Sequence, residues 1–137
     1  MELTDFQKIA VRNLKMVGIE IDFLDEQHLR ITQKKLYNGF VLTKNELVDR
    51  AKKIFPDYIV KPVRYSLDVS VIDVIYIKSK IKEIGLNVND LAAQTAIDKS
   101  SLSLFLSGER KMNKSVKALF FYYFLTYELN KNFRSEN

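Results

Sequence analysis

The sequence is poor in the residues that build most catalytic, redox and metal sites. It contains no cysteine, which excludes disulfide bonds and zinc–thiolate sites, and His28 is its only histidine, which excludes a multi-histidine metal site within one chain. Its four glycines are isolated from one another, so there is no glycine-rich loop to hold a phosphate group. Neighbouring carboxylates such as Asp25 and Glu26 are interpreted as a solvated turn. We therefore expect no catalysis, no cofactor and no metal.

Long hydrophobic runs are also missing. No apolar stretch approaches the roughly 20 residues of a membrane-spanning helix, and the first residues show no signal-peptide pattern. We therefore expect a cytoplasmic protein with no membrane partner. What the 137 residues do contain is 47% hydrophobic residues, 12% aromatic residues and a net charge of +5. This composition supports a folded core and is compatible with nucleic-acid binding.

The first part of the chain alternates between helical and strand periodicity. Residues 3–17 place Leu3, Phe6, Ala10, Leu14 and Val17 on one helical stripe. Residues 19–23 and 29–33 then alternate apolar and polar side chains, which predicts a β-hairpin.

A second helix and a third strand follow. Thr43 and Glu46 form the pattern of a capping box, and Pro56 should end the helix that they begin. Residues 58–65 are typical of an edge strand. Residues 1–70 are thus predicted to form a small αββαβ module. Its 12 basic and 10 acidic side chains nearly balance, which argues against a nucleic-acid site there.

The segment from residue 87 to residue 111 has the pattern of two short helices joined by a tight turn. Asp73 should begin a helix that precedes it and ends at Gly85, and Asp98 should cap the second helix of the pair. The positions expected to form the internal contacts are apolar: Leu91, Ala92, Ile97, Leu102, Phe105 and Leu106.

Residues 73–124 resemble the DNA-binding domain of the lambda-repressor/Cro family, also called XRE. The resemblance rests on the Leu91-Ala92 pair, Ile97 in the turn, Leu102 in the second helix, and the Ser107-Gly108 exit with basic residues after it. It implies that residues 71–137 form an all-α, five-helix domain that binds double-stranded DNA, so that the whole chain is α+β. Two positions depart from the family: Val88 replaces its usual Gln, and Ala96 replaces a Gly in the turn.

The second helix of the motif supplies the candidate contacts to DNA. Lys99, Ser100 and Ser103 are expected to face base edges, with Leu104 available for a thymine methyl group. The candidate phosphate contacts are basic or polar residues around the motif: Asn89, Ser101, Arg110, Lys111, Asn113 and Lys114. Serine reads bases promiscuously, so we expect modest sequence specificity.

A run of seven large apolar residues, 119–125, lies in the last predicted helix. One helix buries only a stripe, so part of this run should cover a second surface. That surface is either a two-fold dimer interface or a docking site for residues 1–70. The residues assigned to it are aromatic: Phe120, Phe121, Tyr123, Phe124 and Tyr127.

The sequence thus favours a homodimeric transcriptional regulator of bacterial or phage type that represses by occupying a promoter. The competing interpretation is a protein-binding inhibitor, such as an antitoxin or a phage anti-defence protein. In that case residues 1–70 or the aromatic helix would hold a protein target, and the helix-turn-helix would serve autoregulation.

Overall fold

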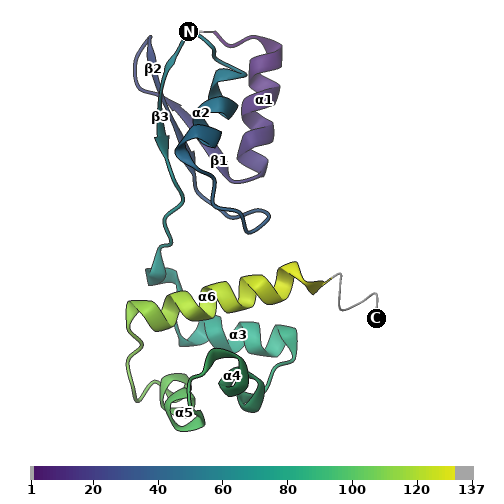
Figure 1. Ribbon diagram of the computed structural model, residues 1–137, viewed down its shortest axis with the longest axis vertical. Helices are drawn as coiled ribbons and strands as arrows, with labels where there is room; N and C mark the ends of the chain where they lie inside the picture. Colours follow the sequence, from purple (N-terminus) through teal and green to yellow (C-terminus); the bar gives the residue numbers. More distant parts are fainter. Residues whose placement is uncertain (1, 132–137) are drawn as a thin grey trace. The chain divides into compact units, whose positions relative to one another are not determined.

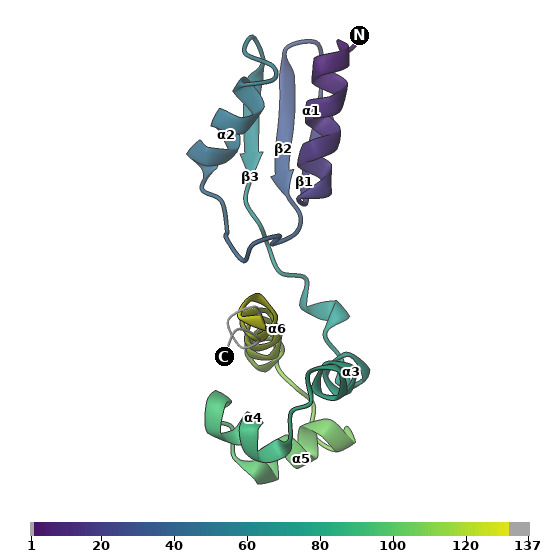
Figure 2. The ribbon, with the colours of Figure 1, turned by 90° about the vertical axis from the view of Figure 1, so that its right-hand side faces the viewer.

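The computed structural model describes residues 2–131, and the chain divides after Ser66 into two compact units (Figures 1 and 2). The described residues form six α-helices, one short 3-10 helix and a three-stranded sheet, so the fold is mixed α+β. The predicted boundary at residue 70 lies slightly after the observed one. No helix within residues 2–131 is long and apolar enough to cross a membrane.

Unit 1 consists of a three-stranded sheet and two helices. Its elements are α1 (Asp5–Met16), β1 (Ile19–Phe23), β2 (His28–Gln33), α2 (Lys44–Lys52) and β3 (Ile59–Val63). The strand order is β1-β2-β3, with β1 antiparallel to β2 and β3 parallel to it. Ile31, in the central strand, pairs with Ile21 on one side and with Pro62 on the other. Pro62 is tolerated because β3 is an edge strand.

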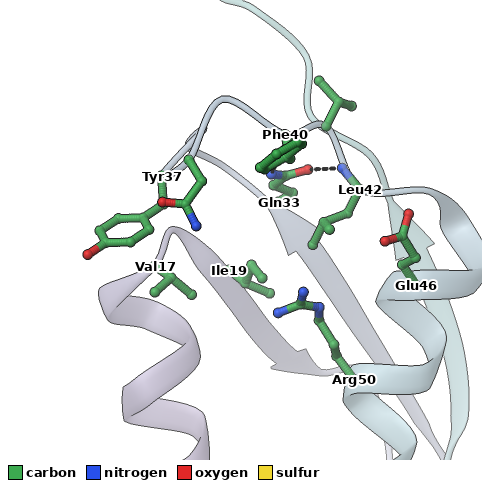
Figure 3. Close-up of a pocket in the computed structure, with 10 residues that line it drawn as sticks. Val17, Ile19, Gln33, Tyr37, Phe40, Leu42, Glu46 and Arg50 are labelled. Carbon is green, nitrogen blue, oxygen red and sulfur yellow. Dashed lines mark hydrogen bonds between the residues drawn. The ribbon is translucent and has the colours of Figure 1, made fainter. Parts of the chain in front are cut away.

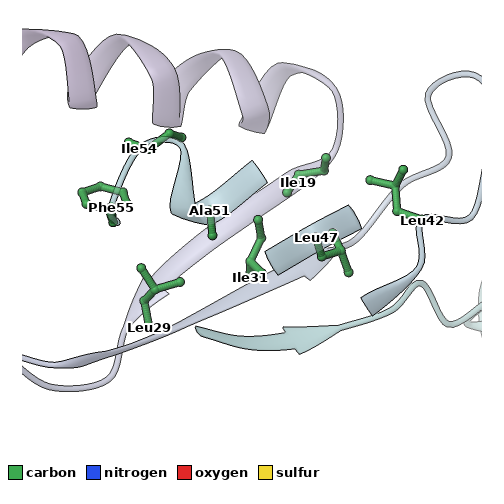
Figure 4. Close-up of a cluster of buried hydrophobic side chains, with 8 residues drawn as sticks. All are labelled: Ile19, Leu29, Ile31, Leu42, Leu47, Ala51, Ile54 and Phe55. Atoms are coloured by element: carbon green, nitrogen blue, oxygen red, sulfur yellow. The ribbon is translucent and has the colours of Figure 1, made fainter. Parts of the chain in front are cut away.

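Both helices of unit 1 pack on the same face of the sheet. The buried cluster between them comprises Ile19, Leu29, Ile31, Leu42, Leu47, Ala51, Ile54 and Phe55 (Figure 4). The opposite face of the sheet is mostly polar, with Ile59 and Val63 of β3 as its apolar members, because side chains alternate along each strand. On that face Lys34 pairs with Glu20 at 3.0 Å and Arg30 lies 3.6 Å from Asp22.

Two details of these helices differ from the predictions. Phe6 was predicted on the inward stripe of α1, but its side chain is 65% exposed, because the inward face also includes Val11 and is turned away from Phe6. The helix α2 begins with the predicted Thr43 capping box but ends at Lys52, before Pro56. The N–H groups of Ile54 and Phe55 both donate to the Ala51 carbonyl, which closes a tight turn after the helix.

Unit 2 is helical throughout its described part. Its elements are the 3-10 helix η1 (Val69–Val71), α3 (Val74–Ile84), α4 (Val88–Thr95), α5 (Lys99–Ser107) and α6 (Lys114–Leu129). Up to residue 131 it therefore has four α-helices, where the resemblance implied five. Each α-helix begins at a side chain that accepts a backbone N–H from its first turn; these caps are Asp73, Asn87, Asp98 and Asn113.

The core of unit 2 is built from all four of its α-helices. The fully buried side chains are Ile72, Ile77, Leu91, Leu102, Phe120 and Phe124. Both ribbon views place α4 and α5 together at one side of the unit and α6 at the other (Figures 1 and 2). Lys80 of α3 pairs with Glu128 of α6, which joins those two helices at the surface.

Candidate nucleic-acid interface

The turn between α4 and α5 contains a residue in the left-handed region. Ala96 has φ = 62°, and its N–H donates to the Ala92 carbonyl, which ends α4. The family that this segment resembles favours glycine at this position, where φ is often positive, and Ala96 adopts such a φ. For a residue with a Cβ this conformation costs about 1–2 kcal/mol. The turn is therefore somewhat strained but well defined.

The side chains of Thr95 and Ile97 also stabilise this turn. The Thr95 hydroxyl donates to the Leu91 carbonyl at 2.6 Å and accepts the N–H of Ile97 at 3.3 Å. Ile97 packs against the buried core of unit 2, as predicted. These contacts hold the start of α5 at a set angle to α4.

The helix α5 has one buried face and one exposed face. Leu102 and Phe105 are buried, whereas Lys99, Ser100 and Ser103 are exposed and lie on one side of the helix at its amino end. These three residues are the ones that the sequence predicts to face base edges. Leu104, the fourth, is half-buried at the margin of that side.

A chain of hydrogen bonds joins the start of α5 to the loop after it. Asp98 accepts the N–H of Ser101 at 2.7 Å and its hydroxyl at 3.1 Å, and the Ser101 hydroxyl accepts from Arg110 Nη1 at 3.0 Å. The backbone N–H of Ser101, followed by its hydroxyl, holds the pKa of Asp98 below its ordinary value. The cap by Asp98 was predicted, but Arg110 and the Ser101 hydroxyl were predicted only as phosphate contacts, so the hydrogen bonds that join them were missed.

Arg110 is fixed further by its own surroundings. Its guanidinium lies 5.9 Å from the centre of the Phe105 ring, and its backbone N–H donates to the Leu104 carbonyl at 3.1 Å. The side chain remains exposed, so N–H groups are left to meet another partner. Its position relative to α5 is therefore set before any ligand arrives.

The remaining predicted phosphate contacts lie at helix starts and in the exit loop. Lys111 and Lys114 are exposed, and Lys114 is the first residue of α6. Asn113 is the cap of α6, so its side-chain oxygen is already used to accept the N–H of Val116 at 2.8 Å. Asn89 is exposed in the first turn of α4.

The surface from residue 98 to residue 114 is weakly electropositive. It contains four basic side chains, Lys99, Arg110, Lys111 and Lys114, and two acidic ones, Asp98 and Glu109, which leaves a net charge of +2. The amino end of α6, a helix of 16 residues, adds the positive end of its dipole.

The aromatic helix α6 is oriented differently from the prediction. Phe120 and Phe124 are 0% and 1% exposed within the core of unit 2, so their assignment to an interface was wrong. Phe121 and Tyr123 are half-buried against the same core, and Tyr127 is also half-buried. The Tyr123 hydroxyl donates to Gln94 Oε1, which ties α6 to α4. The helix is therefore amphipathic despite its composition.

The outward face of α6 carries apolar residues that the sequence-based assignment missed. Leu119, Tyr122 and Leu129 are all exposed, and their spacing of three and seven residues puts them on one side of the helix. We call these three residues the outer stripe of α6. The side of α6 that faces outward follows from the burial of Phe120 and Phe124. The sequence alone did not reveal this side, because the run contains no polar residue to mark it.

Comparisons with known proteins do not place this chain in a family. The chain matches no family model, no curated protein and no solved structure. Residues 2–131 contain no group of three or more His, Asp or Glu side chains arranged to hold a metal ion. The function is therefore argued from the geometry of α4, α5 and the loop that follows.

Proposed function

We propose that the chain is a DNA-binding transcriptional regulator that inserts the amino end of α5 into the major groove and represses by occupying a promoter. The observation that carries this proposal is the division of α5 into a buried face and an exposed polar face. Leu102 anchors the first, and Lys99, Ser100 and Ser103 form the second. A helix held in this way presents its first turn to a groove, as recognition helices do.

The basic residues beyond α5 supply the phosphate contacts. Lys111 and Lys114 are exposed, and Arg110 is held beside Ser101 with donors still available. The N–H groups at the start of α6 also favour an anion. In this arrangement most of the affinity comes from phosphates and falls steeply with salt.

Sequence preference comes from the two exposed serines and Lys99. Serine hydroxyls donate to or accept from several bases, whereas bidentate pairs need Arg, Asn or Gln. Asp98 adds a carboxylate at the cap of the same helix and weakens the attraction to phosphate locally. We therefore expect a regulator with a modest ratio of specific to non-specific affinity.

The outer stripe of α6 is the surface that we assign to homodimer formation. A two-fold dimer would present two copies of α5 to successive major-groove segments, about 34 Å apart. Leu119, Tyr122 and Leu129 are apolar, exposed and on one side of a regular helix, which are the features that a helix–helix interface requires. This assignment replaces the one made from Phe120 and Phe124.

Charge reversal tests the proposal. The Lys111→Glu, Lys114→Glu double variant should bind all duplex sequences more weakly, because two phosphate contacts are lost. The slope of log affinity against log salt, measured by fluorescence anisotropy between about 50 and 200 mM salt, should fall by about 2. The matched control is Lys131→Glu, at the other end of α6.

The control should keep the wild-type slope, because α6 spans about 24 Å and Lys131 lies beyond its far end. Equal affinities of the double variant and of wild type would overturn the phosphate assignment. Failure of the wild-type chain to retain any duplex DNA at about 50 mM salt would overturn the proposed function. Co-purification with one protein target would then favour the inhibitor interpretation.

A further inference from the structure

Unit 1 contains a cavity that the proposed function does not use. It has a volume of about 350 Å³ and lies between the end of α1, the start of β1, the connection from β2 to α2, and α2 itself (Figure 3). Binding sites for small molecules in proteins usually have volumes of about 300–1,000 Å³. The cavity is therefore large enough for a small organic molecule but not for a folded partner.

The lining of this cavity combines apolar and aromatic surface. Val17, Ile19 and Leu42 form its apolar part. Tyr37 and Phe40 lie on the connection from β2 to α2, and their side chains are 64% and 72% exposed. Two large rings left in water beside an apolar hollow are a costly arrangement that an apolar ligand would relieve.

The wall that carries the rings is held in place by one buried amide. Gln33 is 5% exposed; its Nε2 donates to the Phe40 carbonyl at 2.8 Å, and its Oε1 accepts the N–H of Leu42 at 2.8 Å. Arg64 Nε donates to the Leu42 carbonyl at 3.1 Å from the other side. The cavity is therefore formed before any ligand binds, which limits the entropy that binding would cost.

The lining of the cavity also includes an arginine that forms no ion pair within residues 2–131. The Arg50 side chain extends from α2 toward Ile19 and Leu42, and no carboxylate of residues 2–131 lies within ion-pair distance of it (Figure 3). Glu46 lies one turn earlier on α2; its carboxylate accepts the Thr43 N–H at 3.1 Å as part of the helix cap, and this hydrogen bond, with a smaller effect of the Arg50 charge, lowers its pKa. Arg50 is therefore the charged group left to orient a ligand.

We propose that this cavity binds a small organic anion, with the apolar body of the ligand against Tyr37, Phe40 and Leu42 and its carboxylate, sulfonate or phosphate group on the Arg50 guanidinium. A planar guanidinium forms paired hydrogen bonds with each of these groups. All of the residues involved belong to unit 1, so the proposal does not depend on DNA binding.

The test uses 8-anilinonaphthalene-1-sulfonate, an aromatic anion, and N-phenyl-1-naphthylamine, which has the same rings without the charge. Each is titrated into the full chain while backbone amide signals are followed by NMR. The sulfonate should bind saturably, one molecule per chain, and shift signals of the cavity wall such as those of Phe40 and Leu42. The neutral compound should bind about tenfold more weakly, because it lacks the charged hydrogen bonds.

Two substitutions distinguish binding through Arg50 from non-specific binding. Arg50→Gln should weaken sulfonate binding about tenfold and leave the amide spectrum of the free protein dispersed. Arg12→Gln, which removes an exposed arginine of α1 that does not line the cavity, should bind as wild type does. Equal binding of the two compounds, an unchanged affinity in Arg50→Gln, or shifts confined to other parts of the chain would each overturn the proposal.

Discussion

The connections of unit 2 are set by the ends of its helices, whereas the longest connection of unit 1 is held by contacts from distant residues, chiefly the buried side chain of Gln33. Asp73, Asn87, Asp98 and Asn113 cap the four α-helices of unit 2, and Gly85, Ala96 and Gly108 end three of them in the left-handed conformation. In unit 1, residues 34–43 join β2 to α2, and Gln33 holds this segment through its amide. Gln33 is also the only buried polar side chain among the described residues.

The two units therefore differ in whether their connections depend on local or on long-range contacts. A cap is a contact between residues three apart, so it forms as soon as its helix does. The bond between Gln33 and Leu42 joins residues nine apart and exists only when the sheet and α2 have come together. Substitutions in the two units should therefore differ in how local their effects are.

The largest effect should come from the apolar core of unit 2. Phe124→Ala should lower the free energy of unfolding by about 3–5 kcal/mol, because it leaves a cavity among fully buried side chains. Tyr122→Ala, on the outer stripe of the same helix, should cost less than about 1 kcal/mol in the monomer. Urea unfolding followed by circular dichroism measures both. Equal losses would mean that the orientation of α6 is wrong.

The next effect tests the buried amide of unit 1. Gln33→Met keeps the volume of the side chain but leaves the Leu42 N–H and the Phe40 carbonyl without a partner, which should cost about 2–3 kcal/mol. The same substitution at the exposed Gln27 is the matched control and should change stability by less than about 0.5 kcal/mol. Hydrogen exchange at the Leu42 amide should accelerate only in the first variant. Unchanged exchange there would contradict the role given to Gln33.

A smaller effect compares two helix ends within unit 2. Ala96→Gly should raise the free energy of unfolding by about 1 kcal/mol, because it relieves the left-handed alanine. Gly85→Ala should lower the free energy of unfolding by about 1 kcal/mol. The added Cβ meets no other atom, so the only cost is the strain of the left-handed conformation for a residue with a Cβ. Thermal melts of both variants provide the measurement. Changes of the same sign in the two variants would contradict the assigned φ angles.

The smallest effect concerns one charged capping residue in each unit, Glu46 and Asp98. Hydrogen bonds from Ser101 lower the pKa of Asp98, and the backbone N–H of Thr43, followed by its hydroxyl, lowers the pKa of Glu46. The unfolded chain therefore binds more protons than the folded one as these groups titrate. The free energy of unfolding should fall as the pH drops below about 4 and continue to fall through the lowered pKa values.

The Asp98→Asn variant sharpens this test, because asparagine still caps a helix but does not titrate. Urea unfolding at neutral pH and near pH 3 should show a smaller loss of stability in this variant than in the wild-type chain. An equal loss of stability in the two proteins would show that Asp98 does not contribute to this pH dependence.

Much of unit 2 could be predicted because its signals are local. The caps Asp73 and Asp98 were read directly from neighbouring residues, whereas the turn at Ala96 was suggested only by the family resemblance. The orientation of α6 was not predictable in the same way. Residues 119–125 include no polar residue to mark the outward side, so the sequence alone did not separate Phe124 from Tyr122.

In unit 1 the elements could be predicted but several of their contacts could not. The hairpin and the capping box at Thr43 follow from periodicity and spacing. Phe6 was misplaced because several rotations of α1 satisfy the same apolar positions, and only packing against the sheet selects one. Gln33 continues the alternation of β2 but faces inward, and nothing in its own segment identifies its partners. The cavity beside it was missed for the same reason.

Selection of bound fragments from random duplex DNA tests the central claim about α5 most directly. The wild-type chain should enrich a two-fold symmetric site. The Ser100→Ala, Ser103→Ala double variant should enrich a site that differs at the base pairs those hydroxyls reach, while keeping its salt dependence. Identical enriched sites for the two proteins, or no enrichment with either, would contradict the assignment of α5 as the recognition helix.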